Sequence, residues 1–278
     1  MMERIATLCI LFISQFVCGQ QLDVLTYNIK YDNPKDSVNG WDQRKDFLIS
    51  QLNFYAPDVF GTQEGLIHQL EDIKNGLEDY SFVGVGRDEG NGEGEFCAIF
   101  YNQNKIELVE ESTFWLSTTP QKPSKGWDAA IKRICTYGKF KSKENGKEFF
   151  VFNTHFDHVG TRAREESAKL ILKQLKEFNT KQLPTILMGD FNLETTSVGI
   201  QLLLEELQDT HIAAGKNAHG PKGTFNGFDF AKPVTRRIDF IFTDTNSFEV
   251  LKSAILSDSK DCKYPSDHLP VYARLRLE

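Results

Sequence analysis

Predicted strands and helices are mixed along this chain without a regular order, and this mixture restricts the possible fold most strongly. Hydrophobic periodicity predicts helices over 42–53, 66–77, 162–178 and 198–207. It predicts strands over 22–29, 57–61, 80–85, 95–101, 106–116, 131–140, 148–153, 185–187, 237–243, 248–256 and 269–277. A doubly wound parallel sheet needs strands that alternate strictly with helices, so this order disfavours it.

The expected architecture is therefore two mixed sheets packed face to face with helices outside. Asn145-Gly146, between two of the strands, is typical of a β-hairpin and indicates antiparallel neighbours. With 278 residues, 40% hydrophobic and 26% charged, and with no linker or repeat, the chain fits one large domain over 20–278. In such a sandwich, the loops at one end gather into a cleft.

The N-terminal segment has the features of a signal peptide over residues 1–19. Arg4 precedes an apolar run from Ile5 to Val17, and Val17-Cys18-Gly19 offers a cleavage point. A buried first helix, or a lipoprotein anchored through Cys18, is the alternative. No later segment is apolar for long enough to span a membrane, so we expect an exported protein without a stable membrane span.

Charge and cysteine content exclude some classes of protein. A net charge of −7 disfavours tight non-specific binding along nucleic acid, which needs a basic surface. It remains compatible with a small phosphate ester, or with nucleic acid met only as a substrate. Cys97, Cys135 and Cys262 fit neither a disulfide framework nor a zinc motif, and we expect buried, small apolar residues.

Polar side chains follow the ends of several predicted strands. Asp190 and Asn192 come after the apolar run 185–187, and side chains at i and i+2 of an extended chain point the same way. This pair could therefore converge on one ligand. The other strand ends carry Asn28, Gln63-Glu64, Asn153-Thr154-His155, Asp239 and Ser266-Asp267-His268.

Each of these residues also has a purely structural interpretation. Glu64 could cap the following helix, and His155 could be a hydrogen-bonded core histidine. Asp239 could pair with Arg236 or Arg237, and Asp267 could form an Asx turn. Together, however, the set contains the groups needed for metal-assisted hydrolysis of phosphate esters.

Six motifs in order resemble the endonuclease/exonuclease/phosphatase superfamily, which includes DNase I, abasic-site endonucleases, inositol polyphosphate 5-phosphatases, neutral sphingomyelinases and nocturnin-like deadenylases. The motifs are Thr26-Tyr27-Asn28-Ile29, Gln63-Glu64, Asn153-Thr154-His155, Gly189-Asp190-Phe191-Asn192, Arg237-Ile238-Asp239 and Ser266-Asp267-His268-Leu269-Pro270. The resemblance covers residues 22–277. It implies a DNase I-like, four-layered α/β sandwich, with two mixed, mainly antiparallel sheets flanked by helices and a Mg²⁺ or Mn²⁺ site in the cleft.

The resemblance also implies roles for individual residues. Glu64 would be the main metal carboxylate, with Asn28 as ligand or orienting group and Asp267 helping to hold the metal. Asp190 would position or deprotonate the attacking water, and Asn192 would hold a phosphate oxygen. His268, oriented by Asp239, would donate to the phosphoryl oxygens. His155 would protonate the leaving group or contact phosphate.

One position departs from the abasic-endonuclease pattern, which has a metal carboxylate two residues after the first asparagine. Lys30 stands there, and whether Asp32 compensates is left open. Further segments around Trp41, Trp115 and Trp127 resemble a bacterial and fungal branch in which they surround the cleft.

Predicted substrate-binding residues follow from that branch and from the fit of guanidinium groups to oxyanions: Arg133, His158, Arg162, Arg164 and Trp127. A solvated helix start is the alternative for the arginines at 162 and 164, and a core position is the alternative for the tryptophans.

Three functions are compatible with these features. The first is an exported Mg²⁺-dependent phosphodiesterase or phosphatase acting on a small or lipid-derived ester. The second is a secreted nuclease of the DNase or 3′–5′ exoribonuclease type. The third is a non-catalytic binding protein, which the intact set of Glu64, Asp190 and His268 disfavours. We expect a monomer.

Overall fold

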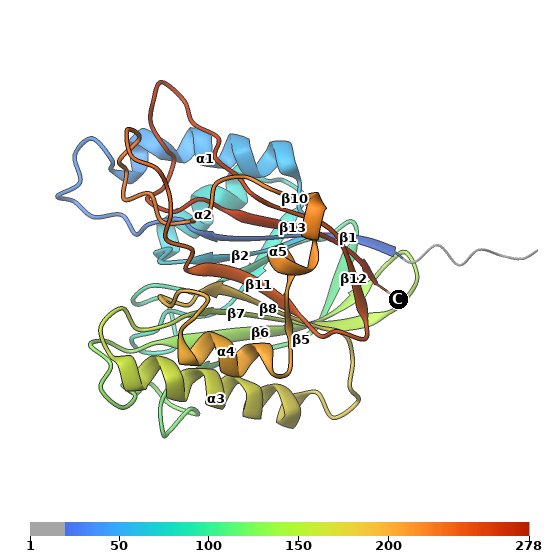
Figure 1. The fold of residues 1–278 in the computed structure, drawn as a ribbon. Coiled ribbons are helices and arrows are strands. Elements are labelled where there is room, and N and C mark those ends of the chain that lie inside the picture. Colours follow the sequence, from blue (N-terminus) through green and yellow to red (C-terminus); the bar gives the residue numbers. More distant parts are fainter. Residues whose placement is uncertain (1–19, 278) are drawn as a thin grey trace, which may run out of the picture.

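Two mixed β-sheets lie face to face at the centre of the computed structural model, which describes residues 20–277 (Figure 1). The first sheet has the order β10 (Ala218–His219), β12 (Phe248–Ile255), β13 (Val271–Leu277), β1 (Gln20–Asn28), β2 (Val59–Gln63), β4 (Ile99–Asn102), β3 (Tyr80–Val83). The second has the order β5 (Ile106–Trp115), β6 (Ile134–Ser142), β7 (Glu148–His155), β8 (Thr185–Asp190), β11 (Asp239–Thr243), β9 (Gln208–Asp209). The pairs β1–β2, β7–β8 and β10–β12 are parallel, and the other pairs are antiparallel.

Helices cover the outer face of each sheet and complete four layers (Figure 1). Helices α1 (Trp41–Tyr55) and α2 (Ile67–Gly76) share an apolar cluster with the first sheet. Helices α3 (Thr161–Phe178) and α4 (Val198–Leu204) share another with the second sheet. The expected DNase I-like sandwich is therefore confirmed. None of the helices within residues 20–277 is long and apolar enough to cross a membrane.

The central strands are buried on both faces, which explains their nearly continuous apolar sequences. In β1, Leu22 and Val24 point into the core between the sheets, whereas Leu25 and Tyr27 point toward α1 and α2. This alternation follows from the two-residue period of a strand. Both cores therefore fix the orientation of β1, and with it the direction of the chain that leaves β1 at Asn28.

A buried polar link joins the two sheets below the cleft. Asn153 on β7 donates its amide to the carbonyls of Thr62 (2.9 Å) and Ala98 (2.8 Å), both in or beside the first sheet. Its Oδ1 accepts a 2.6 Å hydrogen bond from Gln63. Gly61 leaves room for this contact, because a Cβ there would lie 2.6 Å from Cγ of Asn153. The link holds β2 and β7, which both lead into the cleft, at a fixed separation.

Several sequence-based expectations need correction or lie outside the described residues. The strand predicted over 131–140 begins only at Ile134, since the preceding residues form a loop. The sequence pattern missed the short β9, α5 (Thr210–Ala213), the 3₁₀ helix Gly215–Asn217 and β10. Cys97 and Cys135 are buried as expected, but Cys262 is exposed. The predicted signal peptide falls on residues outside 20–277.

Candidate active site

A cleft of about 460 Å³ opens where loops from both sheets meet. Eight of the predicted site residues line it: Glu64, Arg133, His155, His158, Asp190, Asn192, Asp267 and His268. Asn28 and Asp239 lie directly behind this surface, 0% and 1% exposed, and contact the lining residues. The residues predicted at separate strand ends therefore meet in one place.

Asn28 lies at the centre of this arrangement. Its Nδ2 is 3.1 Å from Oε1 of Glu64, 2.9 Å from Oδ2 of Asp190 and 3.5 Å from Nε2 of His268. Its Oδ1 accepts a hydrogen bond from the backbone N–H of Lys30 at 3.1 Å. Because the amide oxygen is engaged locally and the NH₂ faces the carboxylates, the orienting role fits Asn28 better than metal ligation.

Glu64 and Asp267 form the carboxylate end of the cleft. Oε2 of Glu64 is 3.4 Å from Nζ of Lys30, and Oδ2 of Asp267 is 3.6 Å from the same atom, so both carboxylates face the Lys30 ammonium. Burial opposes ionisation of Glu64, but Lys30 and His268 outweigh it and lower the pKa of Glu64. Burial raises the pKa of Asp267, and the nearby Glu64 adds to this effect.

Glu64 is held in this position by its backbone conformation and by hydrogen bonds from Asn28 and Tyr31. It adopts a left-handed conformation with φ of 64°, which is strained for a non-glycine residue and is common at functional sites. Its Oε2 accepts a hydrogen bond from the N–H of Tyr31 at 3.2 Å. Helix α2 instead starts after Leu66, whose N–H is capped by Gln69, so Glu64 does not cap that helix.

The carboxylate oxygens of Glu64 and Asp267 are of the kind that a hard divalent cation prefers. Mg²⁺ prefers oxygen ligands and usually retains several waters, so two carboxylates facing an open cleft suffice. Asp32 does not add a third: its Oδ2 lies 3.0 Å from Nε2 of His68 on α2. The carboxylate that Lys30 replaces is therefore not restored by Asp32.

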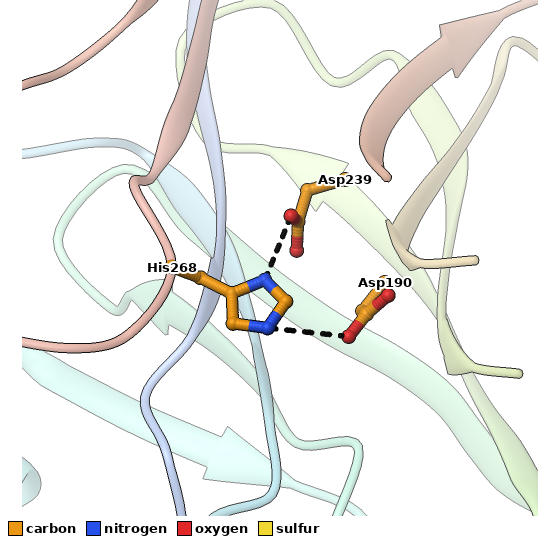
Figure 2. A group of neighbouring side chains, drawn as sticks. All are labelled: Asp190, Asp239 and His268. Carbon is orange, nitrogen blue, oxygen red and sulfur yellow. Dashed lines mark hydrogen bonds and ion pairs between the residues drawn. The ribbon is translucent and has the colours of Figure 1, made fainter. Parts of the chain in front are cut away.

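Asp190, His268 and Asp239 form a buried chain beside these carboxylates (Figure 2). Nδ1 of His268 is 2.9 Å from Oδ2 of Asp239, and Nε2 is 3.7 Å from Oδ2 of Asp190. Burial alone would lower the pKa of His268, but Asp239 and Asp190 raise it to about 10. His268 is therefore an imidazolium at neutral pH, and Asp239 pairs with it rather than with Arg236 or Arg237.

Asp190 has the properties of a general base. Burial, together with the charge of Asp239, raises the pKa of Asp190 to about 7, close to the working range of an acid–base catalyst. The same three residues are close enough to hold a metal ion. An imidazolium with both nitrogens facing carboxylates has no free lone pair, however, so His268 in this state offers no metal ligand, and Glu64 and Asp267 are the other carboxylates that line the cleft.

Asn192 and His155 form the next part of the wall. The strand ends at Asp190, and Asn192 has φ of 49°, so the pair converges through a turn and not through extended chain as we had expected. Nδ2 of Asn192 is 3.1 Å from both Nε2 of His155 and the carbonyl of Phe156. Burial, with Arg133 and Arg87, holds the pKa of His155 well below its usual value, so its imidazole is neutral.

Arg133 and His158 lie beyond His155, and Nη2 of Arg133 is 3.0 Å from Nδ1 of His158. Trp127, Arg162 and Arg164 are not among the residues that line the cleft. Arg164 instead donates to the carbonyl of Asp157 at 3.0 Å. Trp41 and Trp115 are buried in the cores.

Sequence reasoning missed several lining residues: Tyr31, Glu95, Ile131, Phe225, Arg236 and Ile238. Glu95 forms a bidentate pair with Arg87, with distances of 2.6 and 2.7 Å. Both members lie in or near irregular loops, and charged loop residues carry no periodic signal. Only the tertiary structure brings them to the cleft.

Comparison with known proteins finds relatives over most of the chain. The model of the endonuclease/exonuclease/phosphatase family matches residues 25–268. A family protein from Bacteroides thetaiotaomicron has a TM-score of 0.88 and 40% identity, covering 94% of this chain and 99% of that one. A mannosyl-6-phosphatase from B. thetaiotaomicron VPI-5482 has a TM-score of 0.86 and 41% identity, covering 91% and 99%.

Curated sequences include more distant relatives. The uncharacterized protein L388 of Acanthamoeba polyphaga mimivirus is 31% identical over 63% of this chain and 66% of its own length. The CCR4-Not complex 3′–5′-exoribonuclease subunit Ccr4 of Mycosarcoma maydis is 22% identical over 90% of this chain and 49% of its own length. The chain thus spans two thirds or less of these two relatives.

Proposed function

The chain belongs to the endonuclease/exonuclease/phosphatase family, whose members hydrolyse phosphate esters, and we propose that it acts with Mg²⁺ on a small or lipid-derived ester. The observation that carries this proposal is the meeting of Asn28 with Glu64, Asp190 and His268 in one cleft. These contacts combine a metal carboxylate, a base and a cationic hydrogen-bond donor around one point. The proposal includes export, which the apolar run after Arg4 supports.

The proposed reaction is attack of water on phosphorus. Glu64 and Asp267 would hold Mg²⁺, or Mn²⁺, which supplies positive charge to the phosphoryl oxygens when bound. Asp190 accepts a proton as the water oxygen bonds to phosphorus. His268 donates a hydrogen bond to a phosphoryl oxygen as negative charge develops, and Asn192 holds another.

The ester bond then breaks, and the leaving oxygen takes a proton, so the products are an alcohol and a phosphate. His155 is neutral, and its contact with Asn192 suits a phosphate-binding role. His268 has one free N–H, on Nε2, and keeps it on the phosphoryl oxygen, so the leaving oxygen takes its proton from water in the open cleft. Asp239 keeps that imidazolium oriented and charged.

A nuclease is the second candidate, because the Ccr4 relative is an exoribonuclease. The phosphatase relative is more similar, at 41% identity against 22%. The net charge of −7 also gives little support for a polynucleotide. These observations favour a small ester.

Purified protein should be assayed with Mg²⁺ and then with EDTA against phosphomonoesters, phosphodiesters, phospholipids and oligonucleotides. We expect metal-dependent hydrolysis of a small or lipid-derived ester that is lost in Glu64→Ala, Asp190→Ala and His268→Ala. Cleavage restricted to oligonucleotides would favour the nuclease. Normally folded variants that keep full activity would refute the assigned site.

A further inference from the structure

Arg133 carries hydrogen-bonding capacity that the protein itself does not use. Its side chain is 5% exposed and lines the cleft. Nη2 contacts His158, but Nε and Nη1 have no hydrogen-bond partner within the described part of the chain. Buried donors are almost always satisfied, so this guanidinium beside the cleft has capacity for a further acceptor when the site is occupied.

The guanidinium is fixed before any ligand arrives. Oδ2 of Asp157 lies 3.5 Å from Nε of Arg133. Oδ1 of Asp157 accepts hydrogen bonds from the backbone N–H groups of Ala130 (3.1 Å), Val159 (3.0 Å) and Gly160 (2.7 Å). These bonds tie the loop before β6 to the loop after β7. The loop that carries Arg133 is thus hydrogen-bonded to the neighbouring loop through Asp157.

Arg133 is also next to the hydrolytic residues. It and His155 line the same small void behind the cleft wall, and His155 contacts Asn192 and lies 3.4 Å from Asp190. Glu95, an acidic side chain that lines the same cleft, is paired with Arg87 and makes no hydrogen bond to Arg133. Arg133 therefore lies beside the side chains that surround the expected phosphoryl position.

We infer that Arg133 binds a non-bridging oxygen of a phosphomonoester dianion and makes the enzyme select monoesters over diesters. This inference rests on the proposed function and extends it. A monoester at neutral pH has nearly two negative charges and three non-bridging oxygens, whereas a diester has one charge and two such oxygens. Asn192 and His268 account for two oxygens, and Arg133 supplies charge-assisted donors for the third.

The test compares p-nitrophenyl phosphate with bis(p-nitrophenyl) phosphate, which share a leaving group, in the Mg²⁺-loaded protein. We expect wild type to have the higher kcat/KM for the monoester. In Arg133→Met, both values should fall, and the ratio of monoester to diester should fall at least about tenfold. Binding of inorganic phosphate, measured by calorimetry, should weaken at least about tenfold as well.

Arg236→Met is the matched control, because Arg236 also lines the cleft but already pairs with Glu194 and contacts the ring of Phe225. Arg236→Met should change kcat/KM for the monoester and for the diester by a similar factor. Arg133→Lys, which keeps the charge, serves if the methionine variant does not fold. It should retain part of the monoester preference.

Equal losses on both substrates, or unchanged phosphate binding, would overturn the inference while leaving phosphate-ester hydrolysis intact. A wild-type preference for the diester would also overturn it. Absence of hydrolysis of any phosphate ester would instead refute the proposed function. The two failures are therefore distinguishable.

Discussion

Replacing Asp239 by Asn should remove one of the two carboxylate charges that keep His268 protonated, while retaining the size of the side chain and an oxygen that can accept from Nδ1. Asp239 and Asp190 outweigh burial and raise the pKa of His268 from 6.5 to about 10. That difference corresponds to about 5 kcal/mol of preferential stabilisation of the imidazolium. If Asp239 supplies about half of it, the pKa of His268 in the variant falls by roughly two pH units.

The loss of activity expected in Asp239→Asn depends strongly on pH. At pH 9, His268 is mainly protonated in the wild type, but only about one tenth would be protonated in the variant. The activity of Asp239→Asn relative to wild type should therefore fall by a further factor of about ten between pH 7 and pH 9. In wild type, kcat/KM should rise as Asp190 ionises near pH 7 and fall as His268 loses its proton near pH 10.

The free energy of unfolding should also depend on pH through the raised pKa of His268. Because the folded pKa of His268 is raised, its contribution to stability is fully present below pH 6.5 and is lost as pH rises through about 10. Asp239→Asn should therefore cost more unfolding free energy at pH 6 than above pH 10.

The assays are the pH profile of kcat/KM and the NMR titration of the His268 ring in EDTA. Asp229→Asn, at a surface aspartate paired with Lys232, is the control. A His268 titration midpoint and an alkaline limb that both stay within half a pH unit of wild type would refute the reasoning.

Three further predictions concern the metal site and the core. Glu64→Gln should weaken Mn²⁺ binding in calorimetry at least about tenfold, whereas the exposed Glu71→Gln should not, and equal affinities would contradict the assignment. Lys30→Gln should tighten Mn²⁺ binding several-fold, because it removes a cation 3.4 Å from Glu64 and 3.6 Å from Asp267; weaker binding would count against this. Asn153→Ala should cost about 2–4 kcal/mol in urea unfolding, since it removes three buried hydrogen bonds, to Thr62, Ala98 and Gln63, and a cost below about 1 kcal/mol would exclude the inter-sheet link as a major contribution.

The sequence predicted the layers of this fold because each long element has a clear apolar pattern. Helix α3 begins one residue before its predicted start and ends where expected, at Phe178. Strands β9 and β10 have two residues each and are defined by their partners, Asp209 opposite Phe242 and Ala218 opposite Ser253. No local pattern of that length distinguishes a strand from a loop.

The sequence indicated which residues form the site better than it indicated how those residues are arranged. Polar residues that interrupt apolar strand ends, such as Asp190 and His268, are visible in the sequence. The left-handed backbones of Glu64 and Asn192 are not, because both residue types usually take ordinary conformations and only tertiary contacts hold these. Contacts of Lys30 with two distant carboxylates likewise depend on loop packing.

The contacts of Asn28 have a consequence for folding. They join positions 162 residues apart, to Asp190, and 240 residues apart, to His268. Contacts of such long sequence separation form late, because the entropy of closing large loops must first be offset. During refolding, helices and hairpins can therefore be in place while the catalytic groups are still apart. Catalytic competence is in this sense a property of the complete topology, because Asn28 ends a strand of the first sheet and Glu64 follows another, whereas Asp190 and Asp239 belong to strands of the second, so each sheet on its own carries only part of the site.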